Sequence, residues 1–212
     1  MTRIIVVRHG QSEANLLGIG AGQSNTQLTP LGHAQAAAVA RYLVSRESIT
    51  AVYSSDLDRA YETALPTANA LGLTVTKDRR LREVDTGLFT GRRCDRREIE
   101  FPEYYKIMKE TPSLMQYPEG EYVPDVYDRM KECICEIVDR HRGETLLIAS
   151  HAGALKSFLA YGLGYSRVET AMAPPIANTA ISIFEWDGEK MTPVEINSTE
   201  HLTDLDTHIE KE

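Results

Sequence analysis

Two histidines in this sequence stand at the ends of apolar, strand-like runs, a position typical of catalytic side chains. His9 follows residues 4–7 and has Arg8 before it, and His151 follows residues 145–149. Open α/β sheets bind ligands beyond the carboxyl ends of their parallel strands, so both imidazoles reach one crevice if the two strands are neighbours. A neutral imidazole is a competent nucleophile, and a guanidinium beside it can hold phosphoryl oxygens through paired hydrogen bonds. These residue types predict a phosphate site.

The turn after the first histidine is expected to assist. Ser12 and Glu13 predict the start of a helix, so Arg8, His9 and Gly10 lie in a strand-to-helix turn whose free backbone N–H groups favour an anion. Gly10 would let the backbone approach the ligand closely. An Arg-His-Gly tripeptide alone is weak evidence and fits a solvated polar turn better, so the hypothesis depends on other positions.

A second arginine follows another strand-like run at residues 50–53. Ser55 and Asp58 are predicted to form a capping pair for the helix that comes next. Arg59 lies in the first turn of that helix and off its apolar stripe, where an anion is favoured. It is therefore a candidate second phosphate clamp. The plainer alternative is a surface ion pair with Glu62 or Asp58.

Phosphoryl transfer through histidine also needs a proton donor for the leaving oxygen. Glu83 is the first candidate, because it stands among apolar residues in a glycine-containing stretch predicted to form a tight loop against the sheet edge. Asp85 is the competing acid. Either carboxylate could instead pair with Arg82, as carboxylates near arginines commonly do.

These residues must be positioned by elements whose alternation predicts an α/β fold. Strand-like runs are expected at residues 4–7, 50–53, 145–149 and 180–186, and helices at 31–44, 57–71, 126–142 and 152–159. This order predicts one domain over residues 1–212, a three-layer α/β/α structure with a mostly parallel central sheet flanked by helices. Residues 86–124, rich in glycine and proline, predict a helical cap insertion. Residues 199–212 predict a solvated acidic C-terminal tail, with His201 and His208 taking no part in chemistry.

Composition and charge exclude several classes of function. With a formal charge of −8 and a pI near 5.3, the chain lacks the basic face that nucleic-acid binding needs. It shows neither a signal peptide nor an apolar run of transmembrane length, so we expect a cytoplasmic protein without membrane contact. Cys94, Cys133 and Cys135 lack metal-site spacing and are expected to be reduced thiols.

Taken together, the motifs resemble the histidine phosphatase superfamily, branch 1, the phosphoglycerate mutase-like proteins, over most of the chain. The matching positions are Arg8-His9-Gly10 with Ser12 and Asn15, Leu28-Thr29 with Gly32, Ser54 with Arg59-Ala60 and Thr63-Ala64, Leu81 and Glu83 with Gly87 and Gly91, and Ser150-His151. The resemblance implies that His9 becomes a phosphohistidine. It also implies that Arg8, Arg59 and His151 hold the phosphoryl group and that Glu83 serves as acid and then as base.

The resemblance further implies a reaction without a metal or other cofactor, on a small phosphorylated metabolite or a phosphoprotein. Asn15 and Gly22 match positions that line the family's pocket, and Gln23 is added as their neighbour. Arg8, Arg59 and His151 would bind substrate as well as assist the reaction.

Departures from the mutase pattern favour hydrolysis. Mutases of this family typically carry Glu and Trp where this chain has Gln11 and Ala14, and Glu-Arg-His-Tyr-Gly where it has Glu83-Val84-Asp85-Thr86-Gly87. We therefore expect a phosphomonoester hydrolase. A phosphoglycerate mutase-type isomerase and a non-catalytic phosphate-binding scaffold are the alternatives.

Substrate choice is expected to lie with the cap. Arg92, Arg93 and Lys106 either contact the substrate or are solvated cap charges. Five tyrosines suit either the pocket or a homodimer interface, namely Tyr104, Tyr105, Tyr117, Tyr122 and Tyr127.

Overall fold

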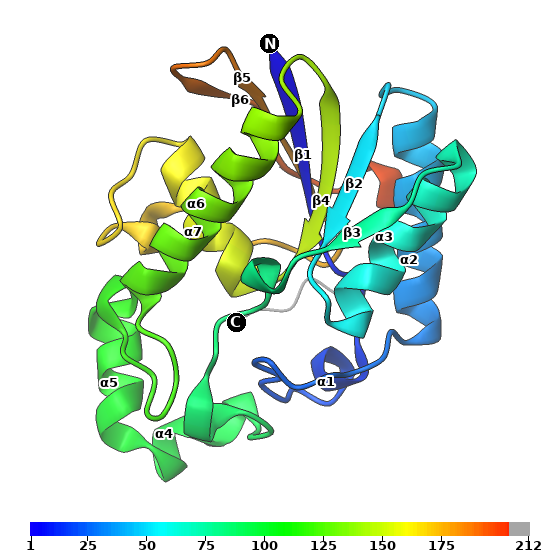
Figure 1. Cartoon of the computed structure of the whole chain (residues 1–212). Coiled ribbons are helices and arrows are strands. Elements are labelled where there is room, and N and C mark those ends of the chain that lie inside the picture. The colour runs from blue at the N-terminus through cyan, green and yellow to red at the C-terminus, as the bar shows by residue number, and fades with distance from the viewer. Residues whose placement is uncertain (204–212) are drawn as a thin grey trace.

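A computed structural model describes residues 1–203 of the chain and contains a central six-stranded sheet (Figure 1). The strands are β1 (Thr2–Arg8), β2 (Ala51–Ser54), β3 (Val75–Lys77), β4 (Thr145–Ser150), β5 (Ile181–Trp186) and β6 (Met191–Ser198). Their spatial order is β3-β2-β4-β1-β5-β6. The first four pair in parallel, whereas β5 runs antiparallel to both of its neighbours. The predicted, mostly parallel sheet is confirmed, and β1 and β4 are direct neighbours.

Helices cover both faces of this sheet, so the predicted three-layer α/β/α architecture is confirmed as well. The flanking helices are α2 (Pro30–Val44), α3 (Asp58–Leu71), α6 (Val123–Arg140) and α7 (Ala152–Gly162). Alternate side chains of β1 serve the two faces: Ile5 and Val7 belong to the core under α2 and α3, and Ile4 and Val6 to the core under α6 and α7. Burying each such side chain contributes about 1.5–3 kcal/mol, so the strand that leads into the turn with His9 is held on both sides.

Two strands of the sheet, β3 and β6, were not predicted from the sequence. β3 has only three residues, too few to show a period, and β6 contains Pro193 with mostly exposed or half-buried side chains. Strands of this kind lack the apolar alternation on which the prediction rested. β6 forms a hairpin with β5 at one edge of the sheet, in orange and red in Figure 1.

The segment predicted as a cap lies beside the carboxyl ends of the parallel strands (Figure 1). It contains short 3-10 turns and two short helices, α4 (Arg97–Glu100) and α5 (Pro102–Glu110), neither of which has a buried residue. Its anchor is Phe89, which is fully buried and packs on Phe101 with ring centroids 4.5 Å apart. α6 already begins at Val123, so the last two residues of the expected insertion belong to that helix. The role of this segment as a cap stays a prediction.

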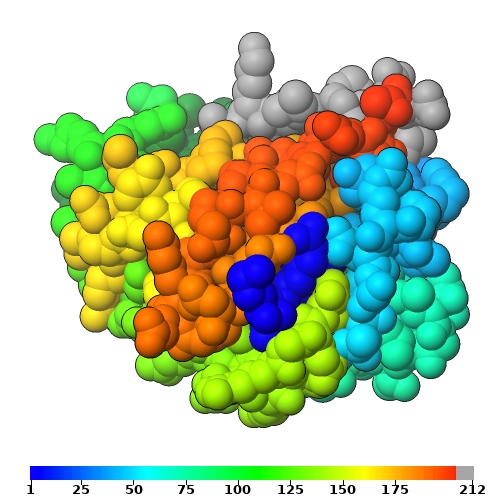
Figure 2. All heavy atoms as spheres, turned by 90° about the horizontal axis from the view of Figure 1, so that it is seen from above, coloured from blue at the N-terminus to red at the C-terminus, as the bar shows by residue number. Residues whose placement is uncertain are grey.

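The opposite end of the sheet is closed. Figure 2 looks onto the amino ends of the parallel strands and shows the N-terminal residues, in blue, packed between the β5–β6 hairpin and the chain around the start of β4. Among the helices of residues 1–203, none is both long and apolar enough to span a membrane.

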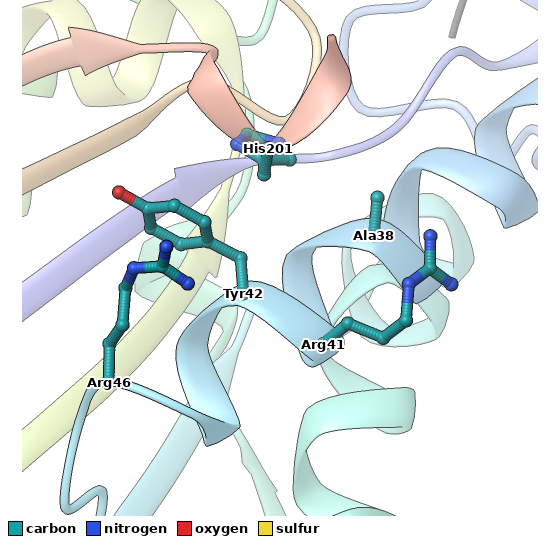
Figure 3. Close-up of a pocket in the computed structure, with 5 residues that line it drawn as sticks. All are labelled: Ala38, Arg41, Tyr42, Arg46 and His201. Atoms are coloured by element: carbon teal, nitrogen blue, oxygen red, sulfur yellow. The ribbon is translucent and has the colours of Figure 1, made fainter. Parts of the chain in front are cut away.

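The expectation of a solvated tail from residue 199 is wrong for its first part. Glu200–Leu202 form a 3-10 turn in which Leu202 is buried, and the His201 ring lies 5.8 Å from the Tyr42 ring of α2. Burial lowers the pKa of His201 to about 4, so the ring is neutral. His201 lines a hollow of about 230 Å³ together with Ala38, Arg41, Tyr42 and Arg46. Figure 3 shows His201 above Tyr42, with Arg41 and Arg46 on opposite sides of that tyrosine. Residues 204–212, with His208, lie outside the described part of the chain.

Candidate active site

The pairing of β1 with β4 brings the two predicted histidines together. Arg8 is in register with Ser150, and the His9 N–H donates to the Ser150 carbonyl at 2.9 Å. The rings of His9 and His151 follow with centroids 5.1 Å apart and planes tilted by 58°. Both side chains are almost fully buried at the carboxyl ends of their strands. The two imidazoles therefore lie side by side at the carboxyl ends of neighbouring parallel strands, as the strand order predicts.

The backbone of the turn is not the anion site that the sequence suggested, because its N–H groups are bound within the protein. The donors and acceptors are His9 N to Ser150 O, Gly10 N to Thr63 Oγ1, Gln11 N to Gln35 Oε1 and Ser12 N to Asn15 Oδ1. Gly10 also has a different purpose, since a Cβ there would stand 2.6 Å from the carbonyl oxygen of Gly32 in α2. Glycine is needed for this backbone contact. An anion must be bound by side chains instead.

Arg59 is the most deeply buried of the candidate cations, with 1% of its surface exposed. Its Nη1 donates to Ser24 O at 2.8 Å and its Nη2 to Gly22 O at 2.9 Å, which excludes the surface ion pair considered above. Burial lowers the pKa of Arg59 to about 10, with Arg8 acting in the same direction and Glu83 against it. At neutral pH the guanidinium is still a cation, held rigidly by two carbonyls.

Arg8 lies at the same place from the other side. It is 5% exposed, and its Nη1 donates to Ile176 O at 2.6 Å. Its charge acts on Arg59, His9 and His151 alike, as the pKa shifts of those three groups show. Two cations thus accompany two imidazoles in one buried region, an arrangement complementary to a phosphate dianion.

The predicted capping pair at the start of α3 is wrong. The helix begins after Leu57, and no side chain caps its N-terminus. The Leu57 N–H donates to Ser55 Oγ at 3.2 Å. The Asp58 carboxylate instead accepts from Asn25 and Gln27 at 2.6 and 3.1 Å. These bonds tie the loop before α2 to the helix that carries the buried arginine. The Ser-x-x-Asp spacing fits a helix cap, but the Asp58 carboxylate is hydrogen-bonded by the distant residues Asn25 and Gln27 instead.

The two imidazoles are neutral. Burial lowers the pKa of His9 well below its usual value, and the charges of Arg59 and Arg8 lower it further. For His151, burial again comes first, followed by Arg59, His9, Arg8 and Arg129. The Nδ1 of His9 lies 2.7 Å from the Gly10 carbonyl, which can only accept, so Nδ1 carries the proton. Nε2 then holds the lone pair that a nucleophile needs.

These buried bases predict a loss of stability in mild acid. Their pKa values in the folded protein lie below the ordinary 6.5, so the unfolded chain binds more protons than the folded one below about pH 6.5. The contribution of these histidines to the free energy of unfolding is fully present above that pH. It is lost as the pH drops toward their pKa values in the folded protein. The slope reaches up to about 1.4 kcal/mol per pH unit for each of His9, His151 and His201. Urea unfolding at pH 7.5 and 5.5 measures it.

Carboxylates with lowered pKa values, such as Asp56 and Asp78, do not affect this measurement. Their contribution to the free energy of unfolding changes only as the pH falls toward and below their ordinary pKa of 3.8. Replacing His201 by Asn should remove one titrating group and reduce the slope. Equal stability of the parent protein at the two pH values would contradict the neutral assignment.

Glu83 lies at the N-terminus of α7, against Gly153 and Ala154, the second and third residues after His151. Its Oε1 accepts from the N–H groups of Val84 and Ala154, both at 2.9 Å, and its Oε2 from that of Gly153 at 3.2 Å. A Cβ on Gly153 would stand 2.8 Å from Oε1, so glycine admits the carboxylate. Within residues 1–203, the longer bond from the Gly153 N–H is the one hydrogen bond that Oε2 accepts.

The other acid is engaged elsewhere. Asp85 Oδ1 accepts from the Gly87 N–H at 3.0 Å within its own turn. Neither acid pairs with Arg82, which forms two 2.6 Å bonds to Asp56. The structure therefore places Glu83, not Asp85, against the helix that starts after the second histidine.

The remaining predicted pocket residues hold other parts of the site. Asn15 Oδ1 accepts from Ser12 in a capping box for α1 (Glu13–Leu16). Gly22, in the left-handed region with φ of 50°, supplies a carbonyl to the buried arginine. Gln23 Nε2 donates to the Glu83 carbonyl at 3.1 Å. The loop with Gly22 and Gln23 thus connects Arg59, a candidate phosphate-binding residue, to Glu83, the candidate acid.

Sequence reasoning missed the stretch before β5. Asn178 Nδ2 donates to the His9 carbonyl at 3.0 Å, and the Thr179 N–H donates to the Arg8 carbonyl at 3.1 Å. Thr179 has a φ of 56°, which is uncommon for a threonine. The signal available was a polar pair just before an apolar strand, but its importance requires knowing that β5 lies next to β1.

Sequence reasoning also missed Arg129 in α6, which fastens the segment carrying Glu83. Its Nη1 donates to the carbonyls of Arg80 and Arg82 at 2.7 and 3.0 Å, and its Nη2 pairs with Glu121 at 2.9 Å. We expect Arg129→Met to lower the free energy of unfolding by about 2 kcal/mol. Because the acid then shifts, kcat/KM should fall roughly 10-fold.

Urea unfolding and phosphate release test this prediction together. Arg142→Met is the control, because the Arg142–Asp139 pair is mostly exposed and should contribute less than about 0.5 kcal/mol. Unchanged kcat/KM in a destabilised Arg129→Met protein would show that Arg129 acts on the fold alone.

The charges of the cap are mainly at the surface. Arg93 pairs with Asp95, both about 60% exposed, and Arg92 and Lys106 are exposed. Residues 1–203 contain no cluster of three or more His, Cys, Asp or Glu side chains suited to a metal ion. Of the cysteines, Cys94 is exposed and Cys133 is buried, and burial raises the pKa of Cys133 to about 12.

Comparison with known proteins agrees with this geometry. The family model described as histidine phosphatase superfamily (branch 1) matches residues 4–199. Phosphoserine phosphatase 1 of Hydrogenobacter thermophilus is 31% identical over 202 residues, covering 95% of each chain. Phosphoglycerate mutase-like protein 4 of Arabidopsis thaliana is 33% identical over 94% of this chain and 86% of its own.

Solved structures share the fold. YhfR of Bacillus stearothermophilus has a TM-score of 0.89 at 28% identity, covering 95% of this chain and 100% of its own. A mycobacterial glucosyl-3-phosphoglycerate phosphatase in complex with VO3 has a TM-score of 0.85 at 26% identity, covering 93% and 99%. A phosphoserine phosphatase mutant of Entamoeba histolytica, in complex with phosphoserine, has a TM-score of 0.84 at 25% identity, covering 95% and 100%.

Proposed function

Because the chain belongs to branch 1 of the histidine phosphatase superfamily, we propose that it hydrolyses small phosphomonoesters through a covalent phosphohistidine on His9. Phosphatases among its relatives and structural neighbours place it with the phosphoric monoester hydrolases. The observation that carries the mechanism is the meeting of two neutral imidazoles, 5.1 Å apart, with two buried guanidinium groups. The unprotonated ring nitrogen of neutral His9 is the nucleophile, and the guanidinium groups of Arg8 and Arg59 compensate the negative charge of the phosphoryl group.

In the first step, Nε2 of His9 attacks phosphorus in line with the ester oxygen. The N–P bond forms as the P–O bond breaks, and Glu83 gives its proton to the departing alkoxide. Arg8, Arg59 and the protonated ring nitrogen of His151 donate hydrogen bonds to the phosphoryl oxygens. Both ring nitrogens of His151 are buried without a hydrogen-bond partner in the described chain, so they are available to a ligand.

In the second step, water attacks the phosphohistidine. Glu83, now a carboxylate, takes a proton from that water as the O–P bond forms, and the N–P bond breaks to return neutral His9. The products are the alcohol and inorganic phosphate. Microscopic reversibility gives one residue both proton transfers, which suits the Glu83 carboxyl group at the N-terminus of α7, the helix that follows His151.

The substrate is proposed to be a small phosphorylated metabolite, with a phosphoprotein as the alternative. Structural neighbours were obtained in complex with phosphoserine and with VO3. Transfer back to a substrate, as in a mutase, is the second candidate activity, because relatives include proteins described as phosphoglycerate mutase-like.

Incubating the purified protein with 3-phosphoglycerate separates these possibilities. We expect phosphate release without formation of the 2-phospho isomer. Isomer formation without net phosphate release would establish the mutase, and no turnover of p-nitrophenyl phosphate would leave a phosphate-binding scaffold.

A further inference from the structure

Asn197, near the end of the edge strand β6, has a conformation that sets it apart from the rest of that strand. Its φ is 55°, in the left-handed region that asparagine adopts more readily than most other side chains. Its N–H donates to Ser182 Oγ of β5 at 2.8 Å, and the pairing of β5 with β6 is irregular at this point. Such irregularities redirect a side chain out of the ladder. The Asn197 amide is therefore turned toward the segment that precedes β5.

The Asn197 side chain binds that segment on both sides of Ile176. Its Nδ2 donates to the Pro175 carbonyl at 2.6 Å, and its Oδ1 accepts from the Ala177 N–H at 3.2 Å. The Ala177 N–H and the Ile176 carbonyl belong to one peptide group, which is planar. One amide thus fixes the direction in which the Ile176 carbonyl points.

The Ile176 carbonyl in turn binds the guanidinium of Arg8. It accepts from Nη1 at 2.6 Å in a buried place, and Arg8 itself is 5% exposed. Hydrogen bonds therefore run without a break from Asn197 Oδ1 through the peptide group to the guanidinium, and bonds in such a chain strengthen one another. Because a guanidinium binds phosphoryl oxygens in a fixed, planar geometry, the direction of its N–H groups affects how well it binds them.

The far end of the same segment is held independently of Asn197. Thr179 donates its N–H to the Arg8 carbonyl, its Oγ1 donates to the Asn178 carbonyl at 2.7 Å, and His201 Nε2 lies 3.3 Å from that Oγ1. Loss of the Asn197 amide should therefore loosen the segment around Ile176 and leave the backbone of the turn with His9 in place.

We propose that Asn197 is a positioning residue, which directs the Arg8 guanidinium toward phosphate through the Ile176 peptide group. The inference rests on the proposed function, in which Arg8 binds the phosphoryl group. It gives the edge hairpin a part in phosphate binding. The competing role for Asn197 is stabilisation of the hairpin alone.

Asn197→Gly tests the inference, because glycine adopts the left-handed backbone and removes only the amide. Calorimetry gives the Kd of inorganic phosphate, and release from p-nitrophenyl phosphate gives kcat/KM. We expect phosphate to bind about 10-fold more weakly and kcat/KM to fall by about the same factor. In an Arg8→Ala background the same substitution should change either quantity less than about 2-fold, because the group that Asn197 positions is absent.

Two further variants separate positioning from stability. Val194→Gly weakens the same strand at a side chain that is 50% exposed, and it should leave the Kd of phosphate within about 2-fold of the parent. Asn197→Ala removes the same contacts as Asn197→Gly but strains the left-handed backbone. It should lower the free energy of unfolding further, with the same effect on phosphate.

The inference is overturned if Asn197→Gly leaves phosphate binding unchanged, if its effect is the same with and without Arg8, or if Val194→Gly has an equal effect. An Asn197→Gly protein that does not fold, or a parent that does not bind phosphate, overturns it as well. Failure of the proposed function looks different. In that case the parent binds phosphate and Asn197→Gly weakens this binding, but no phosphomonoester is hydrolysed.

Discussion

Replacing His9 by alanine is expected to abolish phosphate release while leaving the protein folded. In the proposed mechanism His9 is the nucleophile that forms the phosphoenzyme, so kcat/KM should fall roughly 10⁵-fold or more. The fold should survive, because the ring lies at a strand tip and, within residues 1–203, its side chain makes a single hydrogen bond, to the adjacent Gly10 carbonyl. Phosphate release from p-nitrophenyl phosphate measures the loss. Acid-quenched protein incubated with labelled substrate should show acid-labile phosphate on the parent only.

His33→Ala is the matched control. His33 is 59% exposed and lies 4.0 Å from Glu62 in α3, away from the paired imidazoles. It should keep kcat/KM within about 2-fold of the parent, because exposed substitutions distant from a site have small effects. Parent-like turnover in a folded His9→Ala protein would end the phosphohistidine mechanism.

Much of the fold could be predicted because local and global signals agree in it. The apolar runs that became β1 and β4 carry side chains buried on both faces, and parallel central strands require such continuous runs. β3 and β6 carry no comparable signal, because an edge strand needs to satisfy only one neighbour and can be short or polar. The C-terminal turn was missed for a related reason, since the burial of Leu202 against α2 depends on a contact far away in sequence.

In the site, residue types were predictable and their partners were not. A histidine at a strand tip follows from the sequence, but the bonds that take up the N–H groups of its turn come from Thr63 and Gln35 on α3 and α2. Likewise, the choice between Glu83 and Asp85 depends on where α7 begins relative to the loop, which spacing alone does not give. Such long-range hydrogen bonds decided which partners Arg59 and Arg82 have.

Replacing Glu83 by glutamine is expected to show a strong dependence on the leaving group. Alkyl phosphates such as 3-phosphoglycerate release a basic alkoxide that must be protonated, so loss of the acid should lower the rate of phosphoenzyme formation about 10³-fold. This corresponds to about 4 kcal/mol in the activation free energy. The p-nitrophenolate ion leaves without protonation, so phosphoenzyme formation from p-nitrophenyl phosphate should fall less than about 10-fold. Rapid-quench measurement of this step separates it from hydrolysis of the intermediate.

The substitution is mild for the structure, which allows the kinetic result to be interpreted. The glutamine oxygen can still accept from Val84 and Ala154, and only the long contact of Oε2 with Gly153 changes from acceptor to donor. Asp85→Asn is the control, because its oxygen can keep the bond to the Gly87 N–H, and it should alter both substrates equally and by little. If Glu83→Gln slows both substrates by the same factor, Glu83 positions the site and another group donates the proton. Since alkoxide and phenolate differ mainly in their need for that proton, the ratio of the two losses isolates proton donation from every other contribution of this carboxylate.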